Sequence, residues 1–149
     1  MSDVHTATRA AGPSRASGLA RVRMASFGAV TMLIIEFILG MIYNLYGTAP
    51  TASKSIGLFS SPVLALHVVM SILLLVAAVM LLVRSIGARH RLTIWMSALG
   101  LAAIVAAGFA GLGYAGNGAA GASLGMSLAF AVSLASYVVI ILVASPSTA

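Results

Sequence analysis

Four long apolar stretches constrain the fold of this chain more than any other feature of its sequence. They cover residues 24–46, 62–83, 92–114 and 121–143, and Glu36 is the only charged residue within them. An α-helix rises about 1.5 Å per residue, so about 20 apolar residues cross a hydrocarbon core roughly 30 Å thick. Each stretch therefore predicts one transmembrane helix.

The composition leaves no room for a separate water-soluble domain. The chain is 61% hydrophobic and 7% charged, whereas about 25% of the residues in soluble domains are charged. We expect an all-α, polytopic membrane protein, in which residues 24–143 form an antiparallel bundle of four transmembrane helices. Residues 1–23 are rich in Ala, Ser, Gly and Arg without apolar periodicity, which predicts a disordered basic tail. Residues 144–149 form a second, short tail.

The distribution of basic residues predicts the orientation in the membrane. Lys54 lies in the first loop, and the other seven basic residues precede the first helix or lie in the second loop. They are Arg9, Arg15, Arg21, Arg23, Arg84, Arg89 and Arg91. Because cationic segments resist translocation, we expect a multi-pass protein of the bacterial plasma membrane with both termini in the cytoplasm. The arginines flank helix ends beside lipid, so the predicted partner is the lipid bilayer and not a nucleic acid.

Cysteine is absent from the chain. This excludes disulfides, thiolate metal sites, iron–sulfur clusters and covalent attachment of haem. The eight methionines remain as potential thioether ligands of copper or haem iron.

Small residues at four-residue spacing predict where the helices pack most closely, because association in lipid depends on close approach of the backbones. The third helix carries Ala103, Ala107 and Gly111 on one face. The fourth carries Gly121, Gly125, Ala129 and Ser133 on one face. We therefore expect the last two helices to pack tightly against each other.

Polar residues form a second pattern, which predicts a pocket in the outer half of the bundle. Tyr43 and Asn44 follow Glu36 by seven and eight positions and so share its face of the first helix. Ser71 lies one turn beyond His67 on the second helix, and Ser127 lies one turn beyond Ser123 on the fourth. The predicted pocket or proton-linked residues are Glu36, Tyr43, Asn44, Ser71 and Ser127.

Glu36 has two interpretations. A carboxylate near the bilayer centre costs about 2.5 to 3.5 kcal/mol on insertion scales, so this side chain needs a partner, water or a proton. Glu36 either binds a ligand or a proton, or serves as a structural tether hydrogen-bonded to a serine of another helix.

His67 has three interpretations: a structural hydrogen bond, a metal or haem ligand, or a proton relay with Glu36. Counting from the helix ends places Met41, His67 and Met126 at one depth, about 7 Å below the outer boundary. A weak internal repeat also aligns His67 with Met126. These three residues are the candidate cofactor or metal ligands, for haem b or copper.

Three segments carry a resemblance to known proteins. They are Leu-Gly-Met-Ile-Tyr-Asn-Leu-Tyr at 39–46, Leu-Ala-Leu-His-Val-Val-Met at 64–70 and Asn-Gly-Ala-Ala-Gly-Ala-Ser-Leu-Gly-Met at 117–126. With them the chain resembles a family of small four-helix bacterial membrane proteins, a resemblance that implies no particular activity. The layout is more distantly similar to four-helix b-type haem proteins and to half of a haem A synthase, in which histidines of the second and fourth helices serve the haem. This sequence has His67 on the second helix but Met126 on the fourth.

These observations leave three hypotheses of function. No catalytic or nucleotide-binding motif is recognisable, which favours a non-enzymatic membrane protein that acts by association, as a homo-oligomer or with a membrane partner, or by binding a small ligand in the outer pocket. The second hypothesis is a redox or metal protein that uses His67 and a methionine. The third is a small proton-linked transporter or channel that uses Glu36.

Overall fold

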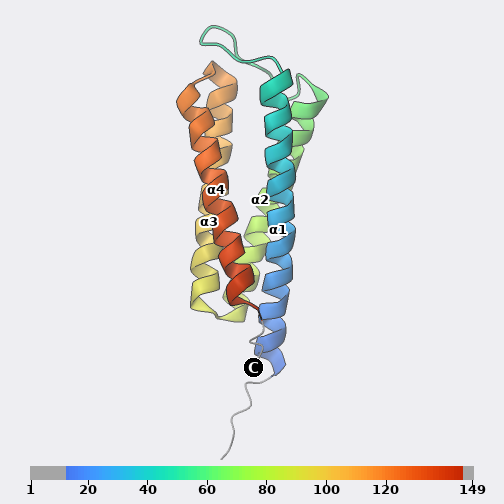
Figure 1. Cartoon of the computed structure of the whole chain (residues 1–149), viewed down its shortest axis with the longest axis vertical. Helices are drawn as coiled ribbons and strands as arrows, with labels where there is room; N and C mark the ends of the chain where they lie inside the picture. Colours follow the sequence, from blue (N-terminus) through green and yellow to red (C-terminus); the bar gives the residue numbers. More distant parts are fainter. Residues whose placement is uncertain (1–12, 146–149) are drawn as a thin grey trace, which may run out of the picture.

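The chain folds into four antiparallel helices that run the length of the molecule (Figure 1). The structure, a computed structural model, describes residues 13–145. Its helices are α1 (Pro13–Tyr46), α2 (Pro62–Ala88), α3 (Arg91–Asn117) and α4 (Ala120–Val143). Each contains a segment long and apolar enough to cross a membrane. The predicted fold, an all-α four-helix bundle of a multi-pass membrane protein, is confirmed.

Clear local signals mark the start of α2 and the turn that joins α3 to α4. Ser61 caps α2 by accepting a hydrogen bond from the Leu64 amide at 3.2 Å, and Pro62 follows at a position where a helix needs no amide donor. Gly118 ends α3 in the left-handed conformation, with φ of 69°. The adjacent Asn117 side chain accepts a hydrogen bond from the Ala119 amide at 3.0 Å, which stabilises a tight turn at Asn-Gly.

Helix α1 begins earlier than the sequence pattern predicted. Residues 13–23, which we assigned to a disordered tail, are helical. The reason is a tertiary contact: Val22 is completely buried, and a Cβ placed on Gly18 would lie 3.7 Å from Ala88 at the end of α2. One apolar residue and one glycine carry too little periodicity to be detected in sequence. The rest of the predicted tail, residues 1–12, and residues 146–149 lie outside the described residues.

The bundle consists of two hairpins, α1–α2 and α3–α4, that are packed more closely within themselves than against each other. The α3–α4 pair is the closest of all, as the small-residue pattern predicted. A Cβ on Gly125 would lie 3.6 Å from the Ala110 side chain, and the Ser133 hydroxyl donates to the Gly100 carbonyl at 3.2 Å. Small side chains therefore bring the two backbones together.

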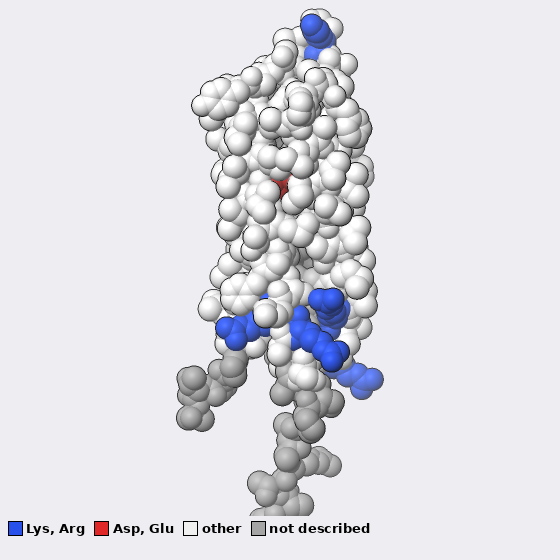
Figure 2. Space-filling model, turned by 90° about the vertical axis from the view of Figure 1, so that its right-hand side faces the viewer, with Lys and Arg blue, Asp and Glu red and all other residues white. Residues whose placement is uncertain are grey.

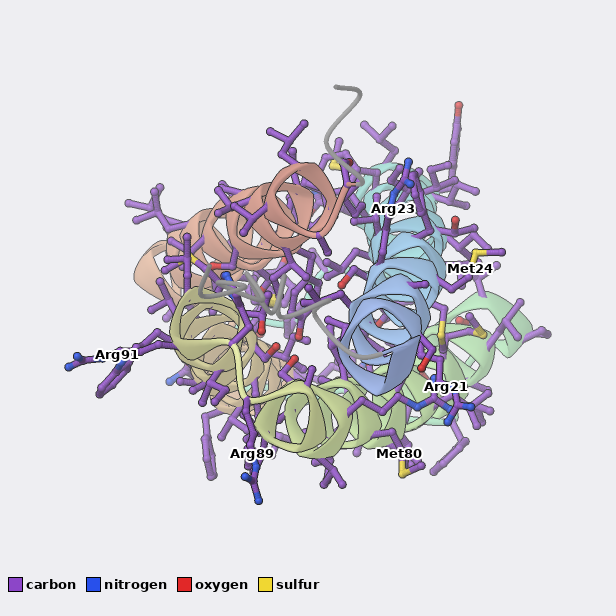
Figure 3. The ribbon with its side chains drawn as sticks, turned by 90° about the horizontal axis from the view of Figure 1, so that it is seen from below. Arg21, Arg23, Met24, Met80, Arg89 and Arg91 are labelled. Atoms are coloured by element: carbon purple, nitrogen blue, oxygen red, sulfur yellow. The ribbon has the colours of Figure 1, made fainter. Side chains whose placement is uncertain are left out.

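Charge separates the two ends of the bundle. The described arginine side chains lie at one end, Lys54 lies at the other, and the red of Glu36 is visible between them at mid-height (Figure 2). We call these the arginine end and the Lys54 end. Viewed along the bundle from the arginine end, Arg23, Arg89 and Arg91 point away from the helices (Figure 3). The long apolar surface between the two ends matches a hydrocarbon core.

The half of the bundle near the arginine end is filled with side chains. Tyr137, Leu81 and Ile140 are completely buried there. Between them lie small hydroxyl groups with partners close by: Ser85 and Ser97 hydrogen-bond to each other at 2.7 Å, and the Ser26 hydroxyl donates to the Val22 carbonyl at 3.0 Å. This half is therefore a dense core that includes satisfied polar groups.

Replacement of Gly100 tests this dense packing. A Cβ at Gly100 would lie 2.7 Å from Cζ of the completely buried Tyr137 ring, which has no free space to move into. Gly100→Ala should lower the free energy of unfolding, measured in mixed micelles by circular dichroism, by about 1 to 3 kcal/mol. A Cβ at Gly113 would meet no atom of the described residues within 4 Å. Gly113→Ala should therefore not lower the free energy of unfolding. Equal stabilities for the two variants would contradict the described packing.

Candidate functional site

A cavity of about 530 Å³ occupies the half of the bundle near the Lys54 end. All four helices and the α1–α2 loop contribute to its wall. Its volume lies within the range of about 300 to 1,000 Å³ that is usual for small-molecule sites. The bundle is therefore asymmetric along its length, with a dense half and a hollow half.

All eight candidate residues predicted from the sequence line this one cavity. They are Glu36, Met41, Tyr43, Asn44, His67, Ser71, Met126 and Ser127. Most of the other lining residues are apolar, among them Leu74, Ile104 and Val105. An apolar wall with a few converging polar groups is the usual character of a small-molecule site. The role of each residue stays a prediction.

Three polar side chains from α1 and α2 form a cluster at the cavity wall, which we call the Glu36 cluster: Glu36, His67 and Ser71. The Ser71 hydroxyl hydrogen-bonds to Oε1 of Glu36. Nδ1 of His67 lies 3.2 Å from the same oxygen, within ion-pair range. This approach is not a hydrogen bond, and Nδ1 has no hydrogen-bond partner among the described residues. The predicted serine partner of Glu36 is thus Ser71.

The Glu36 cluster has unused hydrogen-bonding capacity. Oε2 of Glu36 is buried and, within residues 13–145, has no partner. A buried polar atom without a partner costs about 1 to 3 kcal/mol. Oε2 and Nδ1 of His67 therefore both have hydrogen-bonding capacity that no group of the described residues uses, and a ligand reaches them only if these side chains shift.

The hydrogen bonds of Ser71 also bear on the proton of Glu36. Its hydroxyl lies 3.0 Å from the His67 carbonyl, one turn earlier in α2, as well as beside Oε1 of Glu36. A serine hydroxyl has one hydrogen to donate, and a carbonyl only accepts. Both contacts are satisfied when Glu36 carries a proton and donates it to Ser71, and also when Ser71 shares its one hydrogen between the two oxygens. The first arrangement would hold a proton on Glu36.

Gly40 makes room for the His67 ring. A Cβ at Gly40 would lie 3.2 Å from Cε1 of the imidazole, which is closer than most Cβ atoms approach a neighbouring atom. Gly40 follows Glu36 by one helical turn, so both residues present the same face of α1 to His67. The absence of a side chain at Gly40 allows the imidazole to pack directly against the α1 backbone.

The α1–α2 loop covers the cavity at the Lys54 end. The Ile56 amide donates to the Ala115 carbonyl at 3.0 Å, and the Pro50 carbonyl packs against Gly118 at the α3–α4 turn. Ile56 and Leu58 line the cavity from above. The roof is thus anchored to the second hairpin by hydrogen bonding and packing.

A stacked aromatic pair closes part of the seam between α1 and α4. The rings of Phe37 and Phe130 have centroids 4.7 Å apart and planes inclined by 22°. Both residues line the cavity. This pair and Gly108 were not predicted from the sequence, because neither a single phenylalanine nor a glycine in an apolar helix indicates a site.

The candidate cofactor ligands also lie around the cavity, on three different elements of its wall. His67 packs against Gly40 of α1, whereas Sδ of Met126 would lie 3.4 Å from a Cβ on Gly111 of α3. Met41 is 40% exposed on α1. Among the described residues no group of three His, Cys, Asp or Glu side chains has the arrangement of a metal site. Ligation of haem b or copper by His67 and a methionine stays a prediction.

Comparisons with protein-family models, with curated proteins and with solved structures returned no match. The class of protein therefore rests on the fold and the apolar spans, which define an integral membrane protein with four transmembrane helices. The resemblances to four-helix bacterial proteins and to b-type haem proteins stay expectations drawn from the sequence.

A double-mutant cycle tests the bond between Glu36 and Ser71. Interhelical hydrogen bonds in membranes contribute about 0.6 to 2 kcal/mol, and we expect a coupling energy in this range between Ser71→Ala and Glu36→Leu. The measurement is the free energy of unfolding of the four proteins in bicelles. Ser127→Ala is the matched control, because its hydroxyl donates to the Ser123 carbonyl of the same helix. If Ser71→Ala and Ser127→Ala show the same coupling energy with Glu36→Leu, the hydrogen bond between Glu36 and Ser71 is contradicted.

Proposed function

We propose that this integral membrane protein binds a small amphiphilic molecule in its cavity, and that the Glu36 cluster recognises the polar group of that molecule. The observation that carries the proposal is the coincidence of a cavity of about 530 Å³ with a buried carboxyl oxygen that has no partner within residues 13–145. Apolar walls suit the body of such a ligand, and a few polar groups fix its orientation. No catalytic role is assigned to these residues.

Mass spectrometry of extracted ligands tests the proposal. The protein is purified in native-lipid particles, and the molecules that co-purify with it are extracted with organic solvent and compared between variants. Gly108 lines the cavity and has open space around it, so Gly108→Trp should exclude the ligand without disturbing the fold. We expect at least one molecule that is enriched with the wild type and lost with Gly108→Trp.

Gly113→Trp is the matched control for this experiment. Gly113 lies five residues further along α3, is exposed, has equal space around it and does not line the cavity. It should retain the molecule. The proposal fails if the wild type carries nothing beyond the lipids of the particle, or if both tryptophan variants carry the same molecules as the wild type.

We also propose that the arginine end faces the cytoplasm of a bacterial cell, which places the cavity in the outer half of the plasma membrane. The support is the separation of the arginines from Lys54 along the bundle (Figure 2). Positively charged segments are retained on the cytoplasmic side during insertion. Association with a second copy or with another membrane protein stays a prediction.

Single-cysteine labelling tests this orientation, because the chain contains no cysteine of its own. Ser55 is exposed in the α1–α2 loop, and Ser145 is exposed at the arginine end. In intact cells a membrane-impermeant maleimide should label Ser55→Cys and leave Ser145→Cys unlabelled until the cells are permeabilised. The reverse pattern would place the cavity in the inner half of the membrane.

A further inference from the structure

We infer that the molecule bound in the cavity is a lipid-soluble organic amine in its cationic form, which enters from the side of the bundle and pairs with Glu36. This inference rests on the proposed function and names the chemical class of the ligand. It is carried by the charges around the cavity, its aromatic wall, its openings at membrane depth and the exchangeable proton of Glu36.

The charges around the cavity favour a cation. Glu36 is the only acidic residue within residues 13–145, and no Lys or Arg of this part of the chain lines the cavity. The described arginine side chains lie at one end of the bundle and Lys54 at the other (Figure 2). An anionic ligand would meet no fixed positive charge here, whereas for an ammonium group the wall supplies a carboxyl group whose second oxygen, Oε2, has unused capacity to accept a hydrogen bond once the side chain turns toward the cavity.

The wall of the cavity is also suited to a cation with an apolar body. Five of the ten aromatic residues of the chain line it: Phe37, Tyr43, Phe109, Tyr114 and Phe130. Aromatic faces attract ammonium groups, and this attraction strengthens when water is excluded. The same rings provide apolar surface for the rest of the molecule.

The cavity communicates with the outside at the depth of the membrane. The α1–α2 loop covers it at the Lys54 end, through the bond between Ile56 and Ala115. By contrast, the lining residues Ile72 of α2 and Phe109 of α3 are 58% and 71% exposed, and a Cβ on Gly108, which also lines the cavity, would meet no atom of the described residues within 4 Å. On the α1 and α2 side, part of Glu36 is visible between surrounding white atoms (Figure 2). A ligand dissolved in the bilayer therefore reaches the cavity without crossing the roof.

Pairing with an ammonium group requires Glu36 to give up its proton. In the empty cavity the two contacts of Ser71 are satisfied together when Glu36 is protonated. When the amine binds as a cation, the O–H bond of the carboxyl breaks, the proton leaves to solvent, and the carboxylate accepts the N–H of the ammonium. One positive charge enters as one leaves, so the net charge of the buried site does not change.

The other titratable groups around Glu36 are few. His67 of α2 lies against it, Tyr43 follows it on α1, and Tyr114 lines the cavity from α3. The lining residues of α4 contribute hydroxyl, thioether and apolar groups. Glutamine is a neutral isostere of glutamate, so Glu36→Gln isolates the contribution of the Glu36 charge.

Equilibrium binding of two matched probes tests the inference. 1-Naphthylmethylamine and 1-naphthylmethanol share one aromatic body, and only the first is a cation between about pH 6 and 8. Both are measured by fluorescence with the protein in phosphatidylcholine nanodiscs, after subtraction of empty nanodiscs. The wild type should bind the amine about tenfold or more tightly than the alcohol, as expected for a charge-assisted hydrogen bond.

Glu36→Gln should remove this preference by lowering the affinity for the amine about tenfold or more relative to the affinity for the alcohol. Lys54→Gln is the control, because it also removes one charge but lies outside the cavity. It should keep the preference. With the wild type, an indicator dye in weakly buffered solution should register about one proton released per amine bound, and none with Glu36→Gln.

The outcomes separate this inference from the proposed function. Equal binding of both probes that is lost in Gly108→Trp would overturn the amine inference and leave ligand binding in the cavity supported. A preference for the amine that survives in Glu36→Gln would overturn the role of Glu36. Absence of binding of both probes to the wild type would overturn the amine inference, whereas the extraction experiment decides the proposed function.

Discussion

The absence of water from the hydrocarbon core is the constraint on which this structure depends. A polar group at membrane depth must find its partner within the protein. The buried serines do so: Ser26 and Ser136 donate to carbonyls one turn earlier in their own helices, and Ser133 reaches Gly100 on the neighbouring helix. The hydroxyl of Tyr137 and Oε2 of Glu36 have no partner within residues 13–145, and of these two residues only Glu36 lines the cavity.

One residue type explains both the dense and the hollow half of the bundle. A glycine brings helix backbones together where a large side chain of the partner fills the space, as Tyr137 does at Gly100. Where no such side chain is present, as at Gly108, the missing side chain leaves part of a cavity. Since α3 carries both glycines, a single helix contributes to the core at one end and to the cavity at the other.

The fold and most of the cavity were predictable from sequence for one reason, the cost of placing polar groups in lipid. That cost predicts the four spans directly, and it predicts that Glu36, His67 and Ser71 face inward, where the structure places them. Sequence periodicity did not predict the start of α1, which depends on contacts of Gly18 and Val22 with other parts of the bundle. Nor did it predict the stacked pair of Phe37 and Phe130, because which apolar side chains meet depends on the rotation of each helix about its axis.

The geometry of the Glu36 cluster supports the proposed binding site more than a structural tether. A carboxyl group that served only to tie α1 to α2 would be most stable with both oxygens hydrogen-bonded, and a leucine would fill the same space without the insertion cost of an acid. Instead, Oε2 of Glu36 and Nδ1 of His67 are buried without hydrogen-bond partners in residues 13–145, beside a cavity large enough for a small molecule. Two unsatisfied groups at the wall of one cavity cost stability in the empty protein, and a ligand that bonds to them recovers that cost. This cost is the physical argument for the proposed binding role of the Glu36 cluster.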